Sequence, residues 1–293
     1  MRAAGFYLFY AFNWIITLLP LRALYIFSDI VYPFFCYFPG YRKKVVEDNL
    51  RNSFPQLSES ERKTIERKFY SHLCDLFVET FKLTHISSKK LKARFTVDNL
   101  QLFDKLQAEG KDVVAVLGHY GNWEWLNCFP LYTSYNCVSI YRPLQNEKFD
   151  SFMHKTRSGN GMKLASMSHV ARDIIENRRK GVRSLYAFIT DQTPPKADIK
   201  YWTQFLNQET PVYLGAEKIA MKFNMAVVFF NISKVGRGKY VLRPELLFDD
   251  CSNLPDHAIT EAHVRKLEEL IVNKPEFWIW SHRRWKYKKT PDA

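Results

Sequence analysis

The most informative stretch for the fold is Val113-Val114-Ala115-Val116-Leu117-Gly118-His119-Tyr120-Gly121-Asn122-Trp123-Glu124. Its first five residues form a continuous apolar run, which is typical of a short strand buried inside a sheet. Gly118 and Gly121 then interrupt the regular backbone on either side of His119. Because open α/β sheets bind their ligands at the carboxyl ends of strands, this pattern predicts that His119 lies in a binding cleft.

Strand-like and helix-like segments alternate around this stretch. Strands are predicted at residues 95–97, 113–117, 137–141, 185–190, 226–233 and 240–246. Helices are predicted at residues 100–109, 123–131, 148–157, 170–180, 214–223 and 261–273. The alternation predicts an α/β fold with a largely parallel sheet covered by helices. The glycines of Val235-Gly236-Arg237-Gly238-Lys239 predict an antiparallel hairpin, so the sheet is expected to be mixed.

Two apolar segments precede the α/β region. Residues 3–19 are apolar apart from Asn13, and residues 23–38 form a second run after Pro20 and Arg22. The first run is near the lower length limit for crossing a bilayer. A signal peptide fits poorly, because only Arg2 precedes the run and no small-x-small cleavage site ends it. We predict a membrane anchor at residues 1–40, either a span or a re-entrant helix pair; two core helices are the alternative.

The residues after the anchor give two local signals. Tyr41-Arg42-Lys43-Lys44 is basic, which favours the cytoplasmic side of a membrane or contact with anionic lipid headgroups. Ser58-Glu59-Ser60-Glu61 is a capping box, and apolar residues recur after it at helical spacing. An amphipathic helix packed on the domain is therefore expected to begin there.

The composition limits the kinds of binding partner that we expect for this protein. The chain has 293 residues, 16% of them aromatic, and a net charge of +13. Such a charge suits nucleic acid, an anionic membrane surface or a phosphorylated substrate. No nucleic-acid-binding motif is present, and we predict no nucleic-acid partner. The five cysteines are scattered and odd in number, which argues against a disulfide framework or a zinc cage.

Two histidines stand five residues before a glutamate, at His119/Glu124 and His263/Glu268. The second pair lies in a continuous helical pattern, where five residues turn by about 500° and point the two side chains apart. We interpret that pair as a chance match. At His119 the glycines allow the chain to turn back, so Glu124 is expected to reach the imidazole.

Longer blocks around these residues resemble one family. His119-Tyr120-Gly121-Asn122-Trp123-Glu124 resembles the catalytic block of the bacterial lipid A late acyltransferases, the lauroyl/myristoyl transferases of the lysophospholipid acyltransferase superfamily. Four further blocks match in order: Tyr141-Arg142-Pro143, Lys155-Thr156-Arg157-Ser158-Gly159, Asp191-Gln192, and Trp280-Ser281-His282-Arg283-Arg284-Trp285-Lys286. With the apolar N-terminus, the resemblance covers nearly the whole chain. It departs at Asn207, where the family usually has a small residue, often Gly.

The resemblance implies an acyltransferase domain at residues 41–293 and a definite chemistry. His119 is expected to be the general base that takes the proton of an acceptor hydroxyl, and Glu124 to be its orienting partner. The hydroxyl attacks a thioester directly, so no Ser or Cys nucleophile, cofactor or metal is needed. The implied donor is acyl carrier protein or acyl-coenzyme A, and the implied acceptor is a lipid A precursor. The implied location is the bacterial inner membrane, with the catalytic domain on its cytoplasmic face.

Seven further residues are predicted to contact or position the substrate: Asn122, Arg142, Arg157, Asp191, Gln192, Arg283 and Arg284. Asn122 is expected to shape the turn or to orient Glu124. Arg142 and Arg157 are candidates for stabilising the thioester oxyanion or a phosphate. Asp191 follows a predicted strand, as His119 does, and is expected to face the same cleft.

Three alternatives remain open at this stage. The same chemistry could act on another lipid acceptor, such as a phospholipid, an aminolipid or a glycolipid. A zinc hydrolase is disfavoured, because His-Glu-x-x-His is absent and the other histidines are scattered. A non-catalytic membrane lipid-binding protein is the third alternative.

Overall fold

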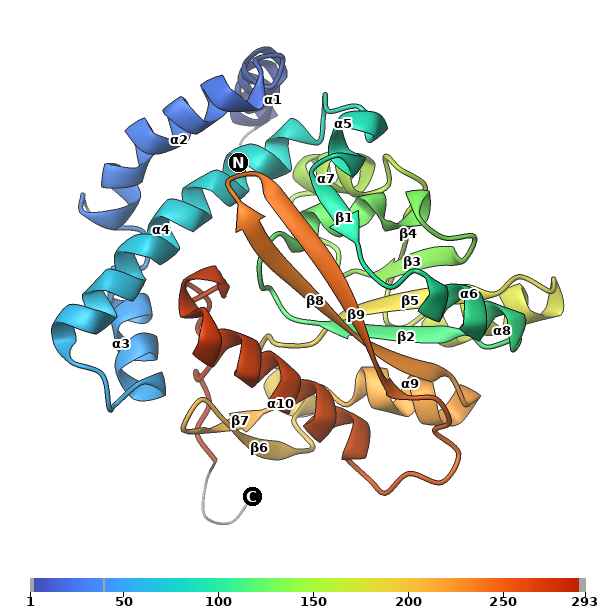
Figure 1. Cartoon of the computed structure of the whole chain (residues 1–293). Coiled ribbons are helices and arrows are strands. Elements are labelled where there is room, and N and C mark those ends of the chain that lie inside the picture. Colours follow the sequence, from blue (N-terminus) through green and yellow to red (C-terminus); the bar gives the residue numbers. More distant parts are fainter. Residues whose placement is uncertain (1–2, 39, 290–293) are drawn as a thin grey trace.

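The computed structural model describes residues 3–38 and 40–289 (Figure 1). Residues 1–2 and 39 of the predicted anchor and residues 290–293 lie outside the described residues. The helices are α1 (Ala3–Ile16), α2 (Leu21–Cys36), α3 (Lys43–Ser53), α4 (Glu59–Lys82), α5 (Ser88–Lys92), α6 (Gln101–Ala108), α7 (Glu147–Arg157), α8 (Val170–Arg179), α9 (Gly215–Phe223) and α10 (Ala258–Asn273). The short 3₁₀ helices are η1 (Trp123–Leu131), η2 (Lys196–Asp198) and η3 (Pro275–Phe277).

A seven-stranded mixed sheet forms the centre of the fold. Its strands are β1 (Phe95–Val97), β2 (Val113–Leu117), β3 (Asn136–Ile140), β4 (Lys163–Ala165), β5 (Ser184–Ile189), β8 (Ala226–Gly236) and β9 (Lys239–Phe248). Their order is β1-β9-β8-β2-β5-β3-β4, and of the pairs described within this sheet only β8–β9 is antiparallel. The predicted α/β class, largely parallel pairing and β8–β9 hairpin are therefore confirmed.

The sheet has a hydrophobic core on each face. In β2, Val114 and Val116 face one core, whereas Val113, Ala115 and Leu117 face the other, and all five side chains are buried. Successive strand residues point to opposite faces, so a continuous apolar run is required where both faces are covered. This burial fixes β2 in the middle of the sheet and so fixes where His119 emerges.

Helix α4 separates the N-terminal helices from the sheet (Figure 1). It begins at the predicted capping box, in which Ser58 and Glu61 satisfy each other's backbone N–H groups. Helix α2 packs along α4, and Figure 1 shows α1 and α2 on the side of α4 away from the strands.

The N-terminal segment forms the helix pair α1 and α2, with large apolar side chains in contact with solvent. Leu8 is 73% exposed, Ile15 67% and Ile26 63%. None of the helices in residues 3–38 and 40–289 has both the length and the hydropathy needed to cross a membrane.

The long connection after β5 contains a hairpin that the sequence did not predict. Strands β6 (Trp202–Phe205) and β7 (Gln208–Pro211) pair antiparallel around Leu206 and Asn207. Both turn residues have positive φ, 50° and 61°. Asn adopts this conformation more readily than most residues, which explains why it replaces the family's usual small residue. The Asn207 side chain also donates to the Ser53 carbonyl at 2.9 Å.

Candidate active site

His119 and Asp191 follow the carboxyl ends of two neighbouring parallel strands. β2 pairs with β5 in a register that sets Leu117 beside Ile189, and the Thr190 N–H donates to the Leu117 carbonyl at 3.0 Å. The chain leaves both strands at the same edge of the sheet. The predicted shared location of His119 and Asp191 is therefore correct.

The two side chains form a buried pair. His119 Nδ1 lies 2.6 Å from Asp191 Oδ1, and the His119 backbone N–H donates to Asp191 Oδ2 at 2.8 Å. Trp278 Nε1 also donates to Oδ2, at 2.7 Å. Burial alone would raise the pKa of Asp191, but attraction to His119 and the hydrogen bonds from His119 and Trp278 lower it to about 2. A carboxylate at Nδ1 fixes the tautomer in which Nε2 carries the free lone pair.

The other ring nitrogen of His119, Nε2, contacts Gln192. Gln192 Nε2 lies 3.2 Å from His119 Nε2 and donates to it in this tautomer. The Trp123 ring packs edge-on against the imidazole, with ring centroids 4.9 Å apart. The His119 side chain retains 17% exposure, against 1% for Asp191.

The two glycines allow close packing around the turn. A Cβ on Gly118 would lie 2.6 Å from Leu267 Cδ1, so α10 packs directly against the backbone there. Gly121 has φ +64°, and a Cβ would lie 2.2 Å from the Ile232 carbonyl oxygen. A larger residue at position 121 would require backbone movement, whereas at position 118 the Leu267 side chain would have to shift.

Glu124 does not contact His119, and the sequence-based expectation that it orients the imidazole is wrong. Arg157 Nε donates to Glu124 Oε2 at 2.9 Å, and Arg157 Nη2 donates to Oε1 at 2.6 Å. Both carboxylate oxygens are thus engaged by one guanidinium. The backbone turns at Gly121, but η1 then carries Glu124 toward the end of α7, while Asp191 already occupies Nδ1. The guanidinium also lies 5.7 Å from the centre of the Tyr141 ring.

Asn122 shapes the turn as predicted but does not contact Glu124. Its Oδ1 accepts from the Trp125 N–H at 3.0 Å and caps η1, while its Nδ2 donates to Glu79 Oε2 at 2.7 Å. Its side chain is fully buried.

The remaining predicted residues are divided between surface and interior. Arg142 and Arg283 are exposed. Arg284 is 1% exposed; its Nη2 donates to the Pro211 carbonyl at 2.7 Å, and burial lowers its pKa to about 10. Arg283 and Arg284 were both predicted to contact or position the substrate, and the structure places their side chains in opposite environments, one exposed and one buried.

Sequence reasoning missed two residues that support the turn. Trp278, at 1% exposure, donates to Asp191, and Glu79, at 0%, accepts from Asn122. Trp278 belongs to the aromatic C-terminal segment, but nothing in its spacing marks it as the partner of Asp191. Glu79 occupies a position of the α4 pattern with no feature that distinguishes it from a surface glutamate.

The second histidine–glutamate pair is separated as expected. His263 lies in α10 with Nδ1 3.5 Å from Thr190 Oγ1, whereas Glu268 accepts from the Leu206 N–H. Nowhere in the described part of the chain do three or more His, Cys, Asp or Glu residues gather in a way that could hold a metal ion.

The fold and the Asp191–His119 pair define a class of protein: an α/β enzyme in which a carboxylate-bound histidine lies at the carboxyl edge of a parallel sheet with its Nε2 lone pair free of the carboxylate. In the residues described, no Ser hydroxyl or Cys thiol hydrogen-bonds to that imidazole. Such a site suits activation of a hydroxyl that the substrate supplies.

Comparison with known proteins gives the family. The model of the bacterial lipid A biosynthesis acyltransferase family matches residues 1–287. The chain belongs to this family and is an acyltransferase, which confirms the sequence-based resemblance.

Three relatives show how far the similarity extends. A lipid A biosynthesis lauroyltransferase of Escherichia coli is 24% identical over 276 residues, covering 93% of this chain and 88% of the relative. A lipid A biosynthesis palmitoleoyltransferase of the same organism is 20% identical over 296 residues, covering 95% and 93%. A lipid A biosynthesis acyltransferase of Haemophilus influenzae is 22% identical over 238 residues, covering 80% and 72%.

Proposed function

We propose that this enzyme transfers a fatty acyl chain from a thioester to a hydroxyl of a lipid A precursor, with His119 as the general base. The observation that carries the proposal is the Asp191–His119 pair, in which Nδ1 lies 2.6 Å from a buried carboxylate and Nε2 lies 3.2 Å from the Gln192 amide. The family membership supports acyl transfer and a lipid acceptor.

In the proposed reaction one proton is transferred twice, first to His119 and then to the leaving thiolate. His119 Nε2 accepts the proton of the acceptor hydroxyl as its oxygen attacks the thioester carbonyl carbon. The C–O bond forms, the C–S bond breaks, and the imidazolium returns the proton to the leaving thiolate. Asp191 stabilises the imidazolium between these steps, which gives it the orienting role that the sequence assigned to Glu124.

The Glu124–Arg157 pair has a different proposed role. A guanidinium held by two hydrogen bonds keeps a fixed orientation, and fixed donors stabilise a developing oxyanion or bind a phosphate. Arg157 is therefore proposed to bind substrate, with Glu124 holding it in place. Arg142 and Arg283 are exposed and are proposed to contact the anionic headgroup of the acceptor or an acidic carrier protein. Arg284 is proposed to support the site from within the C-terminal segment.

The exposed side chains of α1 and α2 are proposed to bind the membrane. In this proposal the anchor predicted at residues 1–40 is a re-entrant helix pair beside the acyltransferase domain. Ile26, Ile30 and Phe34 are 63%, 61% and 62% exposed, and their spacing of four places them on one face of α2. An apolar stripe of this kind binds the boundary between headgroups and acyl chains. Arg42 and Lys44 are exposed just after it, in keeping with the cytoplasmic face of the bacterial inner membrane.

The experiment that tests the central proposal combines purified full-length enzyme in detergent with acyl carrier protein thioester or acyl-coenzyme A. Lipid A precursor is compared with phospholipid, aminolipid and glycolipid acceptors. His119→Ala is expected to lower kcat by roughly 10²–10⁴, and Asp191→Asn by a similar factor, because general-base catalysis is worth about that much. His154→Ala, at an exposed residue of α7, is the matched control. A folded His119→Ala enzyme with near wild-type turnover would refute the proposal.

A further inference from the structure

A fully buried carboxylate, Glu79, contacts the catalytic turn formed by residues 118–122. Glu79 of α4 is 0% exposed, and its side chain accepts three hydrogen bonds. Tyr25 Oη donates to Oε1 at 2.8 Å, Asn122 Nδ2 donates to Oε2 at 2.7 Å, and Tyr240 Oη donates to Oε2 at 2.8 Å. The backbone carbonyl of Glu79 accepts a fourth bond, from Trp125 Nε1 at 3.1 Å. The proposed reaction makes no use of this group.

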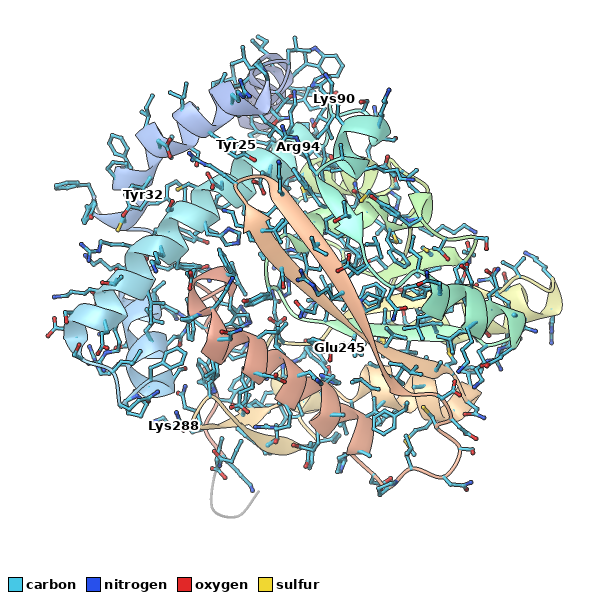
Figure 2. The ribbon with its side chains drawn as sticks, viewed as in Figure 1. Tyr25, Tyr32, Lys90, Arg94, Glu245 and Lys288 are labelled. Atoms are coloured by element: carbon cyan, nitrogen blue, oxygen red, sulfur yellow. The ribbon has the colours of Figure 1, made fainter. Side chains whose placement is uncertain are left out.

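The three donors come from three separate parts of the fold. Tyr25 lies on α2, Asn122 lies in the catalytic turn, and Tyr240 lies on β9. Figure 2 labels Tyr25 where α2 and α4 meet the turn of the β8–β9 hairpin. Gly238 leaves the space for its ring, because a Cβ there would lie 1.9 Å from Tyr25 Oη. Glu79 thus joins α2 and the sheet to the catalytic turn through one side chain.

The contact with Asn122 determines how that amide is oriented. Asn122 Oδ1 accepts from the Trp125 N–H, so its Nδ2 must find an acceptor in a fully buried site, and Glu79 supplies it. An unsatisfied buried amide is costly, and loss of the acceptor favours rotation of the Asn122 side chain. Rotation would remove the cap of η1 and release the backbone that follows Gly121.

Other contacts hold the residues of the turn that precede Asn122: Asp191 accepts from the His119 backbone N–H at 2.8 Å, and Tyr120 Oη lies 3.2 Å from the Leu270 carbonyl and 3.1 Å from the Lys274 carbonyl. The Gly121 N–H donates to the Phe277 carbonyl at 3.0 Å, and His72 Nε2 lies 3.1 Å from the Gly121 carbonyl. These bonds hold Gly121, whereas the side chain of Asn122 is held by Glu79. Because His119 lies three residues before Asn122, movement of this turn changes where Nε2 is presented.

We propose that Glu79 is a positioning residue for acyl transfer, acting through Asn122 to hold His119 in its productive place. The inference rests on the proposed role of His119 and deepens it. Helix α4 then contributes to the reaction, because its Glu79 carboxylate binds both Tyr25 of α2 and Asn122 of the catalytic turn.

A variant that preserves shape tests the proposal. Assays are run at pH 8, above the pKa of about 7 that burial gives Glu79, so that the wild-type side chain is a carboxylate. In Glu79→Gln one carboxylate oxygen becomes an amide donor, which leaves too few acceptors for Asn122 Nδ2 and the two tyrosine hydroxyls. We expect kcat per folded molecule to fall by about 10- to 100-fold, with acceptor KM changed less than threefold. Glu79→Gln/Asn122→Ala should be no slower than the slower single variant, because residues acting as one unit are not additive.

Asp75 provides a matched control one turn earlier on α4. It is 3% exposed, accepts from Ser28 of α2 at 3.0 Å, and pairs with Lys234 and Arg237 of the β8–β9 hairpin. It has no hydrogen bond to the catalytic turn among the described contacts. Asp75→Asn is expected to lower the melting temperature at least as much as Glu79→Gln, yet to keep kcat per folded molecule within about twofold of wild type.

The outcomes separate the two proposals. If Glu79→Gln keeps wild-type kcat per folded molecule while His119→Ala is inactive, Glu79 is structural only and the inference fails alone. If Asp75→Asn loses as much kcat as Glu79→Gln, positioning through Asn122 is also rejected. If His119→Ala is active, the proposed function itself fails. Folded fractions measured by near-ultraviolet circular dichroism in the same detergent normalise each kcat.

Discussion

At the scale of single residues, the Glu124–Arg157 pair shows how a conspicuous carboxylate can act away from the base. Side-chain exposure is 9% for Glu124 and 27% for Arg157, so both charges are largely withdrawn from water. Removing one member of such a pair leaves the other uncompensated, which costs on the order of 3–5 kcal/mol for fully buried pairs and less for partly exposed ones. The two residues should therefore behave as one unit.

We predict that Glu124→Gln and Arg157→Met each lower kcat/KM by roughly 10- to 100-fold, and that the double variant is no worse than the poorer single variant. The pH dependence of kcat should stay unchanged in Glu124→Gln, because the imidazole is bound by Asp191, and should change in Asp191→Asn. Steady-state assays across pH check both statements. Glu59→Gln, which breaks the exposed Glu59–Lys63 pair, is the control and should have no effect. A shifted pH profile in Glu124→Gln would restore the sequence-based role of that residue.

The sequence predicted where some residues of this site lie, but it did not predict which of them pair. His119 and Asp191 each follow a buried apolar run, and such runs end at one edge of a parallel sheet, so their shared location was predictable. Their pairing was not, because it depends on β2 and β5 being neighbours although β3 and β4 lie between them in the chain. The choice between Glu124 and Asp191 therefore required the strand order.

At the scale of elements, α1 and α2 expose apolar side chains that a helix of a water-soluble protein would bury. We predict that replacing Ile26, Ile30 and Phe34 with Ser lowers partitioning onto vesicles of anionic and zwitterionic phospholipid by roughly 100-fold. Three half-exposed side chains would each lose about 1 kcal/mol of burial. Vesicle flotation of detergent-depleted full-length protein provides the measurement.

A control triple variant at exposed apolar residues elsewhere distinguishes this face from general solubility. Ile175, Val182 and Val272 are 42%, 37% and 57% exposed on other parts of the surface. Their replacement with Ser should leave flotation within about twofold of wild type. Equal loss in both triple variants would contradict a membrane role specific to α2.

Elements with strong periodicity were predicted well, and those made by turn chemistry were not. The boundaries predicted for β1 and β2 agree with the structure, and the capping box marks the start of α4. Residues 123–131 form a 3₁₀ helix where an α-helix was expected; Pro130 lies inside this segment and lacks the N–H that an α-helical hydrogen bond would need. The β6–β7 hairpin was missed because Leu206 is an unusual residue for a turn with positive φ.

At the scale of the whole molecule, several buried ionisable groups make the free energy of unfolding depend on pH, and they do not all act in the same direction. Burial lowers the pKa of His72 to about 3, and it lowers the pKa values of His263 and His282 to about 4. Burial also raises the pKa of Glu79 to about 7, against the opposing attraction of Lys234. The histidines are therefore neutral in the folded state across a range in which the unfolded chain protonates them.

The two kinds of group act in opposite directions. A histidine with a depressed folded pKa contributes stability that is present above its unfolded pKa of about 6.5 and is lost as pH falls toward about 4. A glutamate with a raised folded pKa binds its proton more tightly in the folded state, so it loses stability as pH rises from about 4.5 to about 7. Between pH 5 and 6, unfolding should take up about three protons on the histidines and release about one from Glu79.

We therefore predict that the free energy of unfolding falls as pH is lowered from 6 to 5, by roughly 3 kcal/mol for a net uptake of about two protons. In Glu79→Gln no proton is released from this position on unfolding. The free energy of unfolding should therefore fall more steeply as pH is lowered, by about 1.4 kcal/mol more per pH unit. Urea titrations of the full-length protein in a nonionic detergent, followed by tryptophan fluorescence, measure both slopes. Asp75→Asn again serves as the control and should keep the wild-type slope even if it lowers stability at every pH. Parallel slopes for wild type and Glu79→Gln would mean that Glu79 is already ionised in the folded protein at pH 5, held by its three hydrogen-bond donors.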